Sequence, residues 1–281
     1  MYKGIDVSKW QGSIDWSRVK KAGIQFAMIR SSFGWGTNNK DNYFEKNYKN
    51  AKAVGMPVGA YHYSYAMNPE EAKKEAELCL SVLKGKKFEY PIAFDIEENK
   101  VFALGKTKVS EIIKAFCETL ENAGYYVVIY ANKYSIENYF TDEIFKKYDL
   151  WVAQWSDKCT LKQTYGMWQN SSKGQVDGIT GYVDTDFAYK NYMNIMKSTG
   201  LNGFSKPATT QKTETPKTES PKFKKGDKVK VQNPINYDTG KKFKLYYKIY
   251  EVLEPPKNNR IVIGVDGVVT SAIHVKYLTK V

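Results

Sequence analysis

Short apolar runs rich in β-branched and aromatic residues recur along residues 1–190, and segments with a helical spacing of apolar positions separate the earlier runs. Strands are predicted at residues 3–6, 25–30, 57–63, 90–97, 125–131, 150–155, 166–169 and 182–186. Helices are predicted at residues 41–53, 69–84 and 107–122, the second of them beginning after Asn68 with a proline at its first position. This alternation is typical of βα units that build a parallel sheet.

The last two intervals between predicted strands are too short for full helices. Eight strands in so short a segment therefore predict an α/β fold, namely an irregular TIM-like β/α barrel that is smaller than the ~250 residues of a regular one.

A change of composition divides the chain. Residues 205–221 read SKPATTQKTETPKTESP and contain no large apolar residue, so they cannot form a packed core. Beyond them, β-branched and polar residues alternate between turn signals, which predicts a small all-β domain. We therefore expect a catalytic barrel domain at 1–198, a linker rich in Thr, Pro and Lys at 199–222, and a second domain at 223–281.

The formal net charge of +13 is concentrated near the C-terminus, where residues 223–281 carry 12 basic and 5 acidic side chains. Such a surface favours an acidic polymer, which leaves nucleic acid, an anionic membrane and a phosphate-bearing cell wall as alternatives. Apolar runs are shorter than the ~18 residues of a membrane span, so membrane insertion is not expected. The first residues lack the pattern of a secretory signal, and we expect synthesis in the cytoplasm.

Acidic residues terminate several of the apolar runs. Asp6 ends the first, Asp95 and Glu97 end the fourth, and Asp184 lies in the eighth, whereas Arg30 ends the second. In a β/α barrel the catalytic groups lie at the C-terminal ends of the strands. The two-residue period of a strand places Asp95 and Glu97 on one face, with Cα atoms about 6.6 Å apart.

Two crowded carboxyl groups are the usual equipment for glycoside hydrolysis, because crowding and burial keep one of them protonated as a general acid. Solvated surface acids or a Mg²⁺ or Ca²⁺ site are the alternative interpretations. The sequence contains neither a calcium loop nor a phosphate-binding glycine motif, and only two histidines and three widely spaced cysteines. We therefore predict neither a metal nor another cofactor. Asp186 is in phase with Asp184, so the choice between them stays open, and Glu98 is expected to face away.

The ends of the strands match a known family. The sequences GIDVSKWQGSIDW, FAMIRSSFGWG, VGAYHYS, PIAFDIE, VVIYAN, LWVAQW, MWQ and GYVDTDF occur in order over residues 1–190 and together resemble the family 25 glycoside hydrolases, which are phage and bacterial lysozymes. The resemblance implies an irregular β/α barrel that hydrolyses the β-1,4 bond between N-acetylmuramic acid and N-acetylglucosamine. Peptidoglycan is then the expected partner.

The resemblance also implies roles for individual residues. Glu97 corresponds to the general acid, Asp95 to its partner, and Asp6 and Asp184 to supporting acids. Whether Asp95 or the N-acetyl group of the substrate attacks the sugar is left open. The expected substrate-binding residues are Arg30, Tyr61, Tyr63, Tyr130, Trp151, Gln154 and Gln169. His62 alternates with two of these tyrosines and is expected to face away from the groove.

The C-terminal segments FKKGDKVKV, YDTG and IGVDGVVTSAIHVKYL resemble bacterial SH3-like domains of enzymes that lyse the wall. This resemblance implies wall binding, with Tyr237, Phe243, Tyr246 and Tyr247 as the contact residues.

These features predict a muramidase, and more specifically a phage or prophage endolysin that passes through a holin and lyses a Gram-positive host. A catalytically inactive wall-binding protein is the main alternative. A cysteine–histidine endopeptidase is disfavoured because none of the cysteines begins an expected strand or helix, and nucleic-acid binding by the basic tail is disfavoured by the linked barrel. The sequence makes no prediction about oligomeric state.

Overall fold

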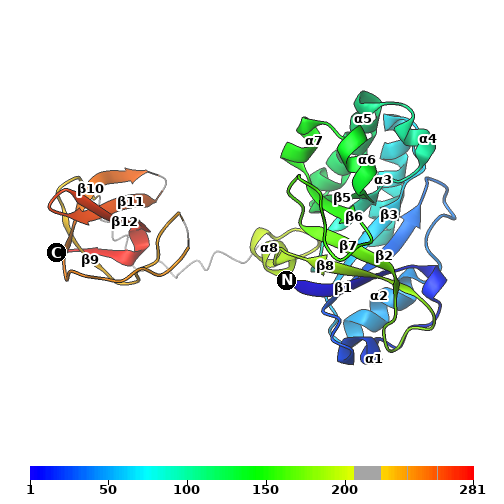
Figure 1. The fold of residues 1–281 in the computed structure, drawn as a ribbon, viewed down its shortest axis with the longest axis horizontal. Coiled ribbons are helices and arrows are strands. Elements are labelled where there is room, and N and C mark those ends of the chain that lie inside the picture. The colour runs from blue at the N-terminus through cyan, green and yellow to red at the C-terminus, as the bar shows by residue number, and fades with distance from the viewer. Residues whose placement is uncertain (206–222, 239, 258) are drawn as a thin grey trace. The chain divides into compact units, whose positions relative to one another are not determined.

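The computed structural model describes residues 1–205, 223–238, 240–257 and 259–281, which belong to two compact units. Most of the predicted linker lies outside the described residues. Figure 1 shows the first unit as strands surrounded by helices and the second as a small group of strands. Within the described residues, no helix combines the length and the apolar character that crossing a membrane requires.

The first unit contains all eight predicted strands. They are β1 (Tyr2–Val7), β2 (Phe26–Phe33), β3 (Val58–Tyr63), β4 (Ile92–Asp95), β5 (Val127–Asn132), β6 (Asp149–Ala153), β7 (Met167–Gly174) and β8 (Val183–Ala188). The helices are α1 (Trp16–Lys21), α2 (Phe44–Ala53), α3 (Pro69–Leu83), α4 (Asn99–Phe102), α5 (Lys106–Asn122), α6 (Lys133–Tyr139), α7 (Asp142–Lys147) and α8 (Tyr192–Thr199). The three predicted helices are thus confirmed as α2, α3 and α5.

The strands close into a barrel in chain order, with β8 hydrogen-bonded to β1. Neighbouring strands from β1 to β7 are parallel, but β8 is antiparallel to both β7 and β1. The predicted parallel sheet is therefore found from β1 to β7, and the last strand departs from it. A parallel connection needs a crossover of about a dozen residues or more, and the short segment between β7 and β8 contains no helix, so the chain reverses direction.

Apolar side chains fill the barrel below its rim. Phe26, Tyr90 and Tyr192 pack together there, with the rings of Phe26 and Tyr90 stacked at a centroid separation of 4.2 Å. A side chain at Gly4 would collide with the ring of Phe26, which explains the glycine at this position in β1. A second apolar layer lies between the barrel wall and the helices, among them α3 and α5.

Residues beyond 198 still belong to the barrel unit. Asn202 is buried, and its side chain donates to the carbonyl of Tyr90 and accepts from the backbone N–H of Tyr126, both at 2.8 Å. Leu201 and Phe204 pack against the same core. The barrel unit thus continues past residue 198, where the sequence placed the boundary, because the polar Asn202 anchors the segments that lead into β4 and β5.

The second unit is a small all-β structure, as predicted. Its strands are β9 (Lys228–Val231), β10 (Tyr250–Lys257), β11 (Arg260–Val265), β12 (Val268–His274) and β13 (Leu278–Lys280). They form one antiparallel sheet in the order β12-β11-β10-β9-β13. Val229, Tyr250 and Ile263 are among the residues of its buried core. The resemblance to SH3-like domains stays a prediction.

Candidate active site

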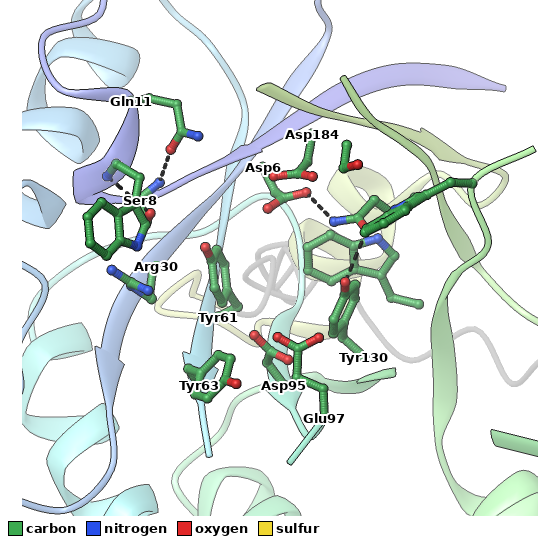
Figure 2. Close-up of a pocket in the computed structure, with 15 residues that line it drawn as sticks. Asp6, Ser8, Gln11, Arg30, Tyr61, Tyr63, Asp95, Glu97, Tyr130 and Asp184 are labelled. Carbon is green, nitrogen blue, oxygen red and sulfur yellow. Dashed lines mark hydrogen bonds between the residues drawn. The ribbon is translucent and has the colours of Figure 1, made fainter. Parts of the chain in front are cut away.

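A cavity of about 380 Å³ opens at the end of the barrel where the parallel strands have their C-termini. Its lining residues are Asp6, Ser8, Trp10, Gln11, Arg30, Tyr61, Tyr63, Asp95, Glu97, Tyr130, Trp151, Trp155, Gln169, Ser172 and Asp184. Figure 2 shows Asp95 and Glu97 on one side of this cavity and Asp6 and Asp184 on the opposite side. The four acids that the sequence singled out therefore share one site.

Strand register explains this convergence. Asp6 on β1 lies directly opposite Asp184 on the antiparallel β8, so both side chains emerge on the same face of the sheet. Asp95 is the last residue of β4, and Glu97 follows it by two positions while the intervening Ile96 is fully buried. The strand is shorter than predicted, yet Glu97 still reaches the cavity.

Asp186 lies deeper than Asp184. It is almost completely buried, and its Oδ1 atom accepts a hydrogen bond of 2.8 Å from Nε1 of Trp151. Asp184 lines the cavity, whereas Asp186 does not. The open choice between these two acids is thus resolved in favour of Asp184 as the cavity residue.

One amide side chain links several polar groups of the site. Tyr130 and Trp155 both donate to Oε1 of Gln169, at 3.0 and 2.9 Å. The amide nitrogen of Gln169 is thereby directed to Asp6, to whose Oδ2 atom it donates at 2.8 Å. Two donors on its oxygen fix the orientation of this amide, so Gln169 presents a donor to Asp6.

The electrostatics of the acids follow from burial and from each other. Burial, and then the nearby Asp186 and Asp184, raise the pKa of Asp6 well above its ordinary value. Burial followed by Glu97 raises the pKa of Asp95, which Arg30 opposes. The pKa of Glu97 is raised by burial, then by Glu98 and Asp184. These carboxyl groups cannot all ionise together, so the site retains protons at pH values where a solvated acid has lost them.

Arg30 is held by a carboxylate outside the cavity. Its guanidinium contacts Oδ2 of Asp41 through Nε at 2.9 Å and through a terminal nitrogen at 2.8 Å. Asp41 is buried and also accepts from the backbone N–H groups of Lys9 and Tyr43. This network ties the segment after β1 to β2 and fixes the position of the cation.

The structure places six of the seven predicted substrate-binding residues in the cavity lining: Arg30, Tyr61, Tyr63, Tyr130, Trp151 and Gln169. Gln154 is the exception. Its side-chain oxygen accepts from the backbone N–H of Thr160 at 2.8 Å, so it organises the following loop. The prediction for Gln154 does not hold because β6 ends at Ala153, after which strand alternation no longer dictates direction.

Glu98 and His62 test the expectation that successive residues of a strand face opposite sides of the sheet. Glu98 was expected to face away, but its Oε1 accepts a hydrogen bond of 2.9 Å from the hydroxyl of Tyr63, a cavity residue. This prediction was wrong because β4 ends before Glu98. His62 lies inside β3 and is fully buried outside the cavity lining, as expected.

The sequence interpretation missed five lining residues: Ser8, Trp10, Gln11, Trp155 and Ser172. Trp10 and Trp155 are the most informative of these, because their side chains are 75% and 64% exposed at the cavity. Both lie just beyond the ends of strands, after β1 and β6. The rule that selected the acids, namely position after a strand end, also identifies these two tryptophans.

The four aromatic residues predicted to bind the wall do not form one surface. Tyr246 and Tyr247 are exposed and line one cavity, whereas Tyr237 lines another. Phe243 packs against the core of the second unit. A common contact surface of all four residues is therefore not what the structure shows.

Within the described residues, no group of three or more His, Cys, Asp or Glu side chains is arranged to hold a metal ion.

The sequence of the barrel unit is similar to those of known proteins. Residues 5–179 match the model of the glycosyl hydrolases family 25. The autolytic lysozyme of Clostridium acetobutylicum is 30% identical over 190 residues, which cover 66% of this chain and 55% of that protein. This chain thus spans little more than half of that relative.

Two solved structures share the fold. The CTP1L endolysin superposes with a TM-score of 0.62 at 28% identity and covers 70% of each chain. A bacterial lysozyme from Streptomyces coelicolor superposes with a TM-score of 0.57 at 31% identity, over 67% of this chain and 92% of the other. The family match covers more than half of the sequence and coincides with the barrel that carries the acidic cavity. The chain belongs to glycosyl hydrolase family 25.

Proposed function

We propose that this protein is a peptidoglycan hydrolase, an N-acetylmuramidase that cleaves the β-1,4 bond between N-acetylmuramic acid and N-acetylglucosamine. The observation that supports this most directly is the shared cavity of Asp6, Asp95, Glu97 and Asp184, in which burial raises the pKa of Glu97. Similarity to an autolytic lysozyme and to a bacterial lysozyme adds support for the substrate.

Glu97 is proposed as the general acid. Its raised pKa favours retention of the proton at pH values where a solvated glutamate has lost it, and its partial exposure at the cavity lets it approach the glycosidic oxygen of a bound strand. Asp95 lies deeper beside it and is proposed to stabilise the oxocarbenium-like centre, either directly or by orienting the N-acetyl group of the substrate. Burial and Glu97 raise the pKa of Asp95 on balance, and Arg30 acts against them, in the direction that this role requires.

The remaining groups are proposed to bind the sugars. Asp6 and Asp184 offer acceptors to hydroxyl or amide groups, and the donor from Gln169 fixes Asp6. Trp10 and Trp155 present exposed rings at the cavity, and flat aromatic faces pack well on the apolar faces of sugars. A glycan strand that crosses the rim would contact both kinds of residue.

We further propose that the protein acts on a Gram-positive wall as a phage or prophage endolysin that is synthesised in the cytoplasm and released through a holin. The similarity to the CTP1L endolysin supports this role, and the similarity to a bacterial autolytic lysozyme makes a host autolysin the competing one. Lysis that requires co-expression of a holin supports the first role. Lysis by the chain alone in the producing cell contradicts it.

The decisive experiment digests purified Gram-positive peptidoglycan with the wild type and with Glu97→Gln, reduces the products, and identifies the new reducing sugar by mass spectrometry. We expect reduced muramic acid from the wild type and a loss of activity of about 10²–10⁴-fold in the variant. Reduced glucosamine or new peptide termini would assign a different bond. An inert wild type would favour the inactive wall-binding protein.

A further inference from the structure

A patch on the second unit combines exposed aromatic and basic side chains. The patch surrounds a cavity of about 500 Å³, and we call it the Tyr246 patch. Its residues are Lys230, Val231, Leu245, Tyr246, Tyr247 and Lys248. The side chains of Tyr246 and Tyr247 are 70% and 55% exposed. Adjacent exposed aromatic residues in a hollow are typical of a binding surface.

The main chain under these two rings is held by the core. The backbone N–H groups of Tyr246 and Tyr247 both donate to the hydroxyl of Tyr250, at 3.0 and 3.2 Å. Tyr250 is buried, and its ring meets that of Tyr247 edge-on at a centroid separation of 5.9 Å. The main chain that carries the two exposed tyrosines is therefore held to the core by hydrogen bonds.

The charge of the patch has one sign. Lys230 and Lys248 form no ion pair within the described residues, and no acidic residue lines the patch. Lys244 extends the basic surface, with its ammonium 5.4 Å from the centre of the Tyr246 ring. Three of the five acids between 223 and 281 are paired with other cations: Asp227 with Lys280, Asp238 with Arg260 and Glu251 with Lys228. A positive potential is therefore left uncompensated around the two tyrosines.

We propose that the Tyr246 patch binds an anionic polymer of sugar or polyol units joined by phosphodiester links and carried on the bacterial wall. Lys230 and Lys248 pair with the phosphates, and the rings of Tyr246 and Tyr247 pack on the carbon skeleton between them. The repeating polymer offers many equivalent sites, so that the tethered barrel is kept near its substrate. The proposal rests on the proposed function for the bacterial wall as the target.

The other cavity of the second unit suits a different ligand. It is lined by Tyr237, Glu254, Pro255, Lys257, Arg260 and Val262. Arg260 is already paired with Asp238 through two hydrogen bonds of 2.9 and 3.0 Å. Because this cavity mixes both signs of charge, it does not favour a polyanion, and it provides a matched control site.

The test measures co-sedimentation of the full-length Glu97→Gln chain with purified Gram-positive walls, before and after hydrofluoric acid removes the phosphodiester-linked polymers. We expect binding that weakens with added NaCl and is lost on the stripped walls. The pair Tyr246→Ala with Lys248→Gln should weaken binding to intact walls by about tenfold or more. The matched pair Tyr237→Ala with Lys257→Gln should leave binding within about twofold of the parent.

Other results overturn the proposal. Equal binding to stripped walls would assign recognition to the glycan or its peptides. If binding is lost on the stripped walls but the substitutions at Tyr246 and Lys248 have no effect on intact walls, the polymer binds another surface of the protein. Equally tight binding to double-stranded DNA of the same phosphate concentration would mean that the patch binds any polyanion through its positive charge.

Failure of this proposal is distinguishable from failure of the proposed function. Muramidase activity of the chain that retains Glu97, measured on stripped peptidoglycan, should be the same with and without the Tyr246 pair of substitutions. Tyr250→Phe, which removes the acceptor of both N–H groups but keeps the ring, should weaken wall binding less than the Tyr246 pair. An unchanged affinity for this variant, together with an unaffected Tyr246 pair, would rule out the patch.

Discussion

Two clusters of buried polar side chains lie on opposite sides of the barrel wall and differ in how they are paired. Outside the wall, His62 lies between Ser32 and Glu75, with its Nδ1 atom 2.8 Å from the hydroxyl of Ser32 and its Nε2 atom 3.5 Å from Glu75. Both oxygens of Glu75 also accept hydrogen bonds, from the hydroxyl of Ser64 at 2.6 Å and the backbone N–H of Tyr65 at 2.8 Å.

Inside the wall, the buried acids Asp6, Asp95 and Asp186 interact with other carboxyl groups, Asp6 with Asp186 and Asp95 with Glu97. An oxygen of Asp95 and one of Asp186 have no hydrogen-bond partner within the described residues, and the pKa values of all three are raised, first of all by burial. In the outer cluster, Nε2 of His62 has no hydrogen-bond partner within the described residues, but both oxygens of Glu75 are satisfied, so Glu75 is a structural anchor for α3. The inner cluster lowers stability, and its member Asp95 keeps an unpaired acceptor in a residue that lines the cavity.

The largest expected effect comes from changing one carboxyl group of each cluster to an amide. Asp95→Asn should reduce peptidoglycan hydrolysis by about 10²–10³-fold, because an amide cannot stabilise the developing positive charge. Glu75→Gln removes the same charge from the outer cluster and should retain hydrolysis within about threefold once folded. Release of reducing sugars under matched conditions checks both, and equal losses would abolish the distinction between the clusters.

The next largest expected effect is a loss of protein stability when the outer cluster is disrupted. Glu75→Ala leaves the hydroxyl of Ser64 and the N–H of Tyr65 without their acceptor and should lower the free energy of unfolding by about 2–4 kcal/mol. Urea denaturation followed by circular dichroism measures this change. Ala72, on the same helix and buried in the apolar layer, provides Ala72→Ser as a control for a change in α3 that spares the cluster.

Removal of a carboxylate from the inner cluster should raise the stability of the protein, whereas removal of Glu75 from the outer cluster lowers it. Burial raises the pKa of both Asp6 and Asp186, so the folded protein binds more protons than the unfolded chain, and stability is lost as pH rises from about 4 through the folded pKa values. Asp186→Asn keeps an acceptor for Trp151 and removes one of the two charges. It should therefore stabilise the protein by about 1 kcal/mol or more at pH 7.

At lower pH, near 4, the raised pKa values favour the protonated wild-type carboxyl groups, and the gain from Asp186→Asn should be smaller than at pH 7. Thermal unfolding at the two pH values compares the variant with the wild type. A gain of equal size at both pH values would mean that hydrogen bonding, and not charge, causes the effect.

The smallest expected effect concerns the pH dependence of hydrolysis. After burial, Glu98 is the next cause of the raised pKa of Glu97, so Glu98→Gln should lower that pKa. Activity that needs a protonated Glu97 should then decline at a lower pH, with a shift of the alkaline limb by less than about one pH unit. Tyr63→Phe removes the hydrogen bond to Glu98 but not its charge and should shift the limb less.

Much of this site was predictable from the sequence because strand ends are marked by local patterns. Asp6, Asp95 and Asp184 each end or lie within a short apolar run, and topology alone brings the rim of a barrel together. Trp10 and Trp155 obey the same rule and were missed only because aromatic residues usually belong to a core. Gln154 and Glu98 were misjudged for a different reason, since alternation fails once a strand has ended.

The sequence by itself determined the eight strands, the acidic rim and the division into two units, because each of these depends on periodicity and composition within short segments. The family followed from the resemblance of its motifs. Only the tertiary structure decided the reversed direction of β8, the depth of Asp186 below Asp184 and the separation of Tyr237 from Tyr246. These features depend on which distant segments pair and in what register. Register and burial are set by packing across the whole fold, and a local pattern of residues does not encode them.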